Sequence, residues 1–92
     1  MNERIEAKVS GRVQMVMYRD FATRKAHGLR LVGEVQNLAD KTVRVVAEGP
    51  KEKLVAYIEK LNRGSLLAHV EAVEVSWLPA QGTYTSFSIN YD

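Results

Sequence analysis

The chain has 92 residues, of which 46% are hydrophobic and 26% charged, so we expect residues 1–92 to form one folded domain rather than a disordered chain. Its 13 basic and 11 acidic residues leave a net charge of +2, too small to indicate a nucleic-acid partner, and the lack of cysteine excludes disulfides. No apolar run approaches the ~20 residues of a membrane span and no export signal is visible, so we expect a cytoplasmic protein without membrane contact.

The first half of the chain shows the patterns of a strand, a helix and a hairpin. Residues 5–9 alternate apolar and polar side chains, which predicts a strand. From about 16 to 29 the apolar spacing becomes helical, and the predicted stripe contains Phe21, Ala22, Ala26 and Leu29. Residues 32–38 and 42–48 are rich in β-branched side chains and predict two strands of a hairpin.

The second half predicts one more helix and two more strands. Pro50 suits the first turn of a helix and Gly64 suits its end. The apolar stripe of this helix contains Leu54, Val55, Ile58 and Leu61. Residues 70–77 and 84–91 alternate again and predict strands. The element order is therefore βαββαβ with a short extra C-terminal strand.

This order predicts an α+β fold, in which an antiparallel sheet carries both helices on one face. A right-handed connection makes the first two strands parallel, with the third strand between them. Asn37, at the end of the second strand, then lies at the same sheet edge as the loop 11–16. Two strand spacings, about 10 Å, separate them.

The stretch SGRVQMVMYR, residues 10–19, joins the first strand to the first helix and lacks ordinary turn residues. A loop that enters a helix presents unpaired backbone N–H groups and the positive end of the helix dipole. Both favour a phosphate or a carboxylate. Arg19, in the first turn, adds a planar guanidinium that matches two phosphate oxygens. The stretch therefore predicts a binding site for a small anion.

Two segments resemble the signatures of the acylphosphatase family. GRVQMVMYR is similar to G-x-V-Q-G-V-x-[FY]-R, and GEVQNLADKTV is similar to G-[aromatic]-V-x-N-x-x-x-G-x-V. The resemblance implies a small ferredoxin-like enzyme that hydrolyses the carboxyl–phosphate bond of acyl phosphates without metal or cofactor. Its partners would be a small acyl phosphate and the product inorganic phosphate, and we expect a monomer.

The same resemblance implies the site residues. The catalytic arginine of the family falls on Arg19 and its catalytic asparagine, which orients the attacking water, falls on Asn37. The phosphate cradle falls on the backbone of eight residues: Gly11, Arg12, Val13, Gln14, Met15, Val16, Met17 and Tyr18.

Four residues depart from the family pattern. Met15 replaces the glycine of the cradle, Arg30 a glycine after the first helix, and Lys41 a hairpin glycine. Glu34 replaces an aromatic residue. We expect a positive φ at position 15, where a glycine would bind phosphate more tightly and raise turnover. These departures keep an alternative open, a non-catalytic or weakly active anion-binding relative of the same fold.

The remaining candidate residues favour structural roles. His27 and His69 lack partners at metal-ligand spacing, so we predict no metal site. Met17 and Tyr18 are expected to pack in the core, while Gln14 would brace the loop. An RNA-binding function is disfavoured because the first and third predicted strands carry no aromatic residue.

Overall fold

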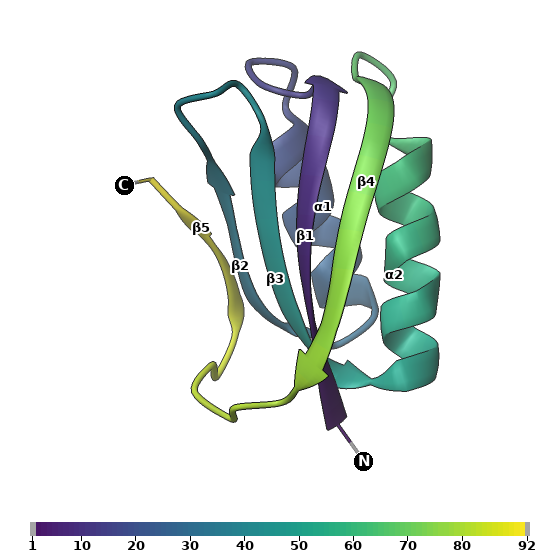
Figure 1. The fold of residues 1–92 in the computed structure, drawn as a ribbon, viewed down its shortest axis with the longest axis vertical. Coiled ribbons are helices and arrows are strands. Elements are labelled where there is room, and N and C mark those ends of the chain that lie inside the picture. The colour runs from purple at the N-terminus through teal and green to yellow at the C-terminus, as the bar shows by residue number, and fades with distance from the viewer. Residues whose placement is uncertain (1, 92) are drawn as a thin grey trace.

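The computed structural model describes residues 2–91, so residues 1 and 92 of the predicted domain lie outside the described part. The elements are β1 (Asn2–Arg12), α1 (Tyr18–Gly28), β2 (Val32–Asn37), β3 (Val43–Pro50), α2 (Lys51–Arg63), β4 (His69–Pro79) and β5 (Phe87–Asn90) (Figure 1). Their order confirms the predicted βαββαβ pattern with an extra strand. Neither described helix is long and apolar enough to cross a membrane.

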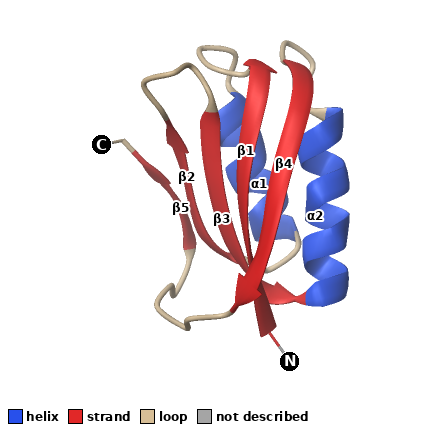
Figure 2. Cartoon of the chain, in the orientation of Figure 1, coloured by secondary structure: helices blue, strands red, loops and turns tan. Residues whose placement is uncertain are grey.

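The sheet has the strand order β4-β1-β3-β2-β5, and both helices cover one of its faces (Figure 2). The first four strands pair antiparallel, and β3 lies between β1 and β2 as predicted. The last strand differs, because β5 pairs parallel with β2 and makes the sheet mixed. The connection from β4 crosses one end of the sheet, so β5 enters its edge in the direction of β2 (Figure 1).

The core lies between the sheet and the two helices. Alternate residues of the strands are buried there, namely Ile5, Ala7, Val9, Val35, Val43, Val45 and Ala47. On α2 the predicted stripe is wrong at Val55, which is 43% exposed, while Tyr57 is fully buried. Tyr57 Oη donates a hydrogen bond to the Ala22 carbonyl oxygen at 2.9 Å, which satisfies its polar end.

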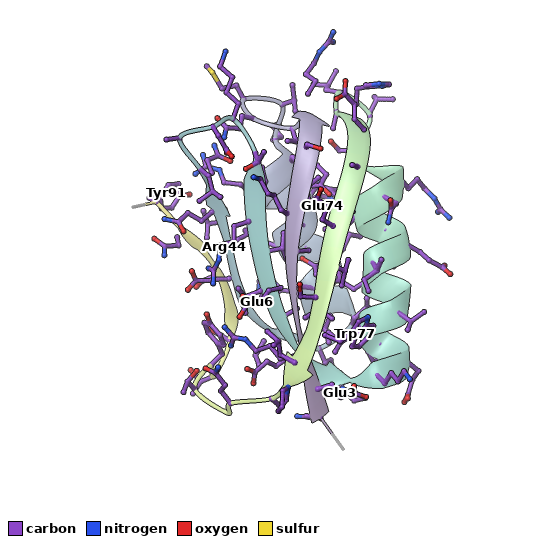
Figure 3. The ribbon with its side chains drawn as sticks, in the orientation of Figure 1. Glu3, Glu6, Arg44, Glu74, Trp77 and Tyr91 are labelled. Atoms are coloured by element: carbon purple, nitrogen blue, oxygen red, sulfur yellow. The ribbon has the colours of Figure 1, made fainter. Side chains whose placement is uncertain are left out.

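The opposite face of the sheet carries charged side chains, among them Glu6, Arg44 and Glu74 (Figure 3). One ion pair on this face is buried, because Arg4 and Glu48 are only 6% and 3% exposed. Arg4 Nη1 lies 2.9 Å from Glu48 Oε2. Burial alone would raise the pKa of Glu48, but hydrogen bonds from the backbone of Gln81, from Arg4 and from Gly82 outweigh it and lower this pKa.

We expect Glu48→Gln to destabilise the fold by about 3 kcal/mol, because it leaves Arg4 buried without its main counter-ion. The folded state favours the carboxylate of Glu48, so its contribution is complete above its ordinary pKa of 4.5 and is lost as the pH falls below that value. Urea denaturation at several pH values from about 3 to about 7 spans the titration of carboxyl groups. It measures both the loss of stability in the variant and its dependence on pH.

Glu6→Gln is the matched control, because Glu6 binds the same Arg4 at 2.9 Å but has a side chain that is 35% exposed. It should cost less than about 1 kcal/mol. An equal loss in both variants would contradict the structural role assigned to Glu48.

Candidate active site

The loop between β1 and α1 is curved by two left-handed methionines. Met15 has φ 60° and Met17 has φ 63°, which confirms the positive φ expected at position 15. Their side chains are 100% and 68% exposed, so the expectation that Met17 lies in the core is wrong. Val13 and Tyr18, at the two ends of the loop, are each only 1% exposed. Buried anchors thus hold a strained, exposed loop.

The backbone N–H groups of this loop point to anion binding. Within residues 2–91, none of the N–H groups of residues 14–20 donates to another backbone group, and α1 has no side-chain cap at its start. A helix N-terminus with free N–H groups favours a negative charge. The loop therefore offers donors suited to phosphate oxygens.

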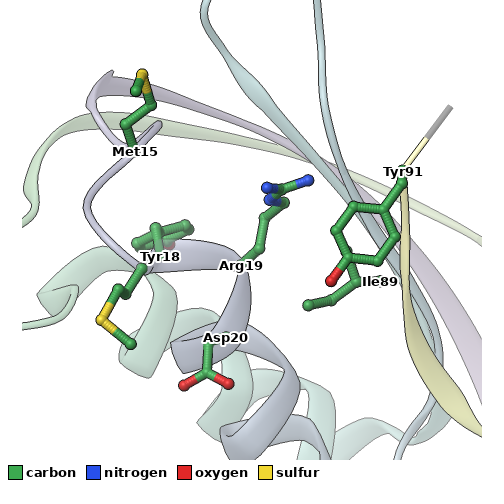
Figure 4. Close-up of a pocket in the computed structure, with 7 residues that line it drawn as sticks. Met15, Tyr18, Arg19, Asp20, Ile89 and Tyr91 are labelled. Atoms are coloured by element: carbon green, nitrogen blue, oxygen red, sulfur yellow. The ribbon is translucent and has the colours of Figure 1, made fainter.

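Arg19 lies in the first turn of α1 and lines a hollow of about 450 Å³ (Figure 4). Its Cζ atom is 5.0 Å from the ring centroid of Tyr91, a cation–π contact. Asp20 also lines the hollow and binds Arg24 at 2.9 Å. Among residues 2–91, the guanidinium of Arg19 thus contacts an aromatic ring and pairs with no carboxylate.

Asn37 is the last residue of β2, so it lies at the same end of the sheet as the loop between β1 and α1 (Figure 1). Gln14 Nε2 donates to the carbonyl oxygens of Leu38 and Thr42, each at 2.8 Å, which confirms its predicted bracing role. The loop is therefore tied directly to the residue that follows Asn37. Among the described residues, the buried Oδ1 atom of Asn37 has no hydrogen-bond partner. A buried acceptor without a partner is rare and suits a bound molecule.

The turn after Asn37 is stabilised by Asp40. Its carboxylate accepts hydrogen bonds from the Thr42 hydroxyl and backbone N–H and pairs with Lys8 at 3.1 Å. The hydroxyl bond contributes most to lowering the pKa of Asp40 to about 2. The turn therefore keeps a fixed negative charge near neutral pH, on an exposed side chain.

Three of the four departures from the family pattern have the backbone that glycine favours. Met15, Arg30 and Lys41 have φ values of 60°, 58° and 71°. Glu34 instead lies on the charged sheet face, where its carboxylate binds Arg44 at 3.4 Å and the Asn90 amide at 3.1 Å. These three departures thus place side chains on left-handed backbone and add local strain.

Gly11 and Arg12 belong to β1 rather than to the loop. A Cβ atom at Gly11, with φ 119°, would lie 2.2 Å from the His69 carbonyl oxygen, so glycine is required there. Tyr18 is buried and donates to the Leu61 carbonyl oxygen at 2.8 Å, which confirms its packing role, and burial raises its pKa. Val16 packs against the core.

The two histidines lie in different environments. His27 Nε2 lies 2.9 Å from the Phe87 carbonyl oxygen and joins α1 to β5. His69 is exposed at the start of β4. The described residues contain no cluster of three or more metal-ligating side chains.

Comparison with known proteins identifies the family. The acylphosphatase family model matches residues 5–89. The chain belongs to the acylphosphatase family. An acylphosphatase from Thermus thermophilus is 55% identical over 74 residues, which cover 80% of this chain and 84% of the relative. One from Salinibacter ruber is 39% identical over 87 residues, covering 95% and 92% of the two chains.

A solved structure agrees with these sequences. The acylphosphatase from Bacillus subtilis matches the fold with a TM-score of 0.94 at 33% identity, covering 99% of this chain and 100% of that chain. The fold is thus the ferredoxin-like fold of the family, and the chain is an acylphosphatase-type hydrolase.

We expect Met15→Gly to stabilise the fold by up to about 1 kcal/mol. Glycine removes a left-handed penalty of ~1–2 kcal/mol, of which its greater freedom in the unfolded state takes back ~0.5–1 kcal/mol. Arg30→Gly is the matched control, with a φ of 58° against 60° for Met15, just after the end of α1. Urea denaturation should show similar gains for both. A loss of stability in Met15→Gly alone would contradict the strain assigned to position 15.

Proposed function

We propose that this acylphosphatase hydrolyses small acyl phosphates in the hollow beside Arg19. The free N–H groups of the loop and the guanidinium of Arg19 would hold the phosphoryl oxygens. The observation that carries the proposal is the buried, unpartnered Oδ1 atom of Asn37, on a segment that Gln14 ties to the loop. This acceptor suits a bound water, although Asn37 is not among the residues that line the hollow.

The chemistry needs positioning and charge stabilisation more than proton transfer. A carboxylate is a good leaving group, so strong acid catalysis is dispensable. Arg19 and the loop N–H groups would stabilise negative charge on the phosphoryl oxygens in the transition state. Asn37 Oδ1 would accept a hydrogen bond from water and direct its oxygen toward phosphorus. The phosphorus–oxygen bond to the acyl group breaks, which gives inorganic phosphate and a carboxylic acid.

The setting of this activity is also a proposal. We infer a monomer in the cytoplasm that acts without a nucleic-acid partner. The near balance of 13 basic and 11 acidic residues supports the last point, because polyanion binding depends on clustered positive charge.

We expect Arg19→Ala to lower kcat for benzoyl phosphate by about a hundred- to a thousandfold, the usual loss when one preorganised donor is removed. Arg24→Ala is the matched control, since Arg24 lies on the same helix but pairs with Asp20 on the surface. It should retain wild-type turnover. Undiminished turnover in a folded Arg19→Ala variant would exclude Arg19 from the reaction.

Asn37→Ala should lower kcat about a hundredfold, since a misplaced nucleophile costs about that factor. Inorganic phosphate should still inhibit the variant as a competitor, because Asn37 is proposed to act on water and not on the phosphoryl oxygens. Inhibition constants for phosphate, measured in both proteins, test the separation. If phosphate no longer binds Asn37→Ala, the amide belongs to the phosphate site.

A further inference from the structure

Large apolar side chains are exposed around Arg19. Met15 is 100% exposed, Met17 68% and Tyr91 77%, and all three line the hollow that contains Arg19. Single exposed apolar residues are ordinary, but a group of them around one cavity marks a binding surface. The proposed reaction at the phosphoryl group leaves this surface without a role.

The strand β5 and the residue that follows it bring Ile89 and Tyr91 to the hollow. It pairs parallel with β2, with Ile89 beside Val35 and Asn90 beside Gln36, and Tyr91 directly follows the last paired residue. Figure 4 shows Ile89 and Tyr91 across the hollow from Met15, with Arg19 between them. One wall of the hollow is therefore apolar and aromatic.

The hollow has more room than a phosphoryl group needs. Its volume of about 450 Å³ lies within the ~300–1,000 Å³ of sites that bind small organic molecules. Its donors come from Arg19 and from the loop, whereas Ile89, Met17 and Tyr91 offer no charged group. Asp20 adds a carboxylate, which disfavours a ligand with a second negative charge.

We propose that the apolar lining of the hollow, formed by Met17 of the loop and by Ile89 and Tyr91 on the opposite side, binds the acyl group of the substrate and selects uncharged apolar acyl phosphates, aromatic ones above all. This inference rests on the proposed function, in which Arg19 and the loop hold the phosphoryl group. An aryl ring packs against Tyr91 and Ile89, while an acetyl group is too small to cover them.

The test compares kcat/KM for benzoyl phosphate and acetyl phosphate in the wild type and in Tyr91→Ala. Both substrates carry the same phosphoryl group, so any effect through Arg19 cancels in the ratio of the two values. We expect the benzoyl-to-acetyl ratio to fall roughly two- to tenfold, the value of one aromatic pair. Met17→Asn should lower the ratio in the same direction, because asparagine tolerates the left-handed backbone at φ 63° but removes the apolar side chain.

Tyr84→Ala is the matched control, because the Tyr84 ring lies 5.8 Å from the Cζ atom of Arg4, away from the hollow. Its ratio should equal that of the wild type. Equal losses for both substrates in Tyr91→Ala would show that Tyr91 acts only on Arg19 and would overturn the acyl subsite. A wild-type chain that hydrolyses neither substrate would instead overturn the proposed function itself.

Discussion

Two hydrogen bonds from one glutamine amide hold the two halves of the candidate site together. Gln14 Nε2 donates to the carbonyl oxygens of Leu38 and Thr42 at 2.8 Å each. The donor follows β1, whereas Leu38 follows β2 and Thr42 precedes β3, and β1 and β2 do not pair because β3 lies between them. A link between the ends of these two strands therefore comes from a loop side chain and not from strand pairing. The position of the loop relative to the turn that follows Asn37 depends on this link.

The curvature of the loop is a second constraint, and the core sustains it. Two left-handed methionines in one short loop cost roughly 1–2 kcal/mol each. Val13 and Tyr18 fix the loop ends, because both are buried and Tyr18 also binds the Leu61 carbonyl oxygen. The packing of these two ends thus offsets the strain of a loop whose N–H groups are free of backbone partners. The side chains of Met15 and Met17 are turned outward as a result.

The order of the elements could be predicted from periodicity in the sequence. The handedness of the connection then placed Asn37 at the same end of the sheet as the loop. The extra strand β5 was predicted, but its place in the sheet was not. Alternation shows which residues share a face, but it shows neither which strand is the neighbour nor whether the two strands run in the same direction. Ile89 and Tyr91 were therefore missing from the predicted site. Met17 was misplaced because its apolar type indicates burial, whereas its backbone conformation determines its direction. The roles of Arg19 and Asn37 in the reaction stay predictions.

Arg4 and Arg19 each contact a tyrosine ring, but the charges of the two guanidinium groups are balanced differently. Arg4 lies under Tyr84, is 6% exposed and binds two carboxylates, so its charge is neutralised within the fold. Arg19 lies against Tyr91, and within residues 2–91 it forms no ion pair. An aromatic ring orients a guanidinium without neutralising its charge. A fixed positive charge beside free N–H groups is therefore suited to binding an anion, whereas Arg4 is already paired within the fold.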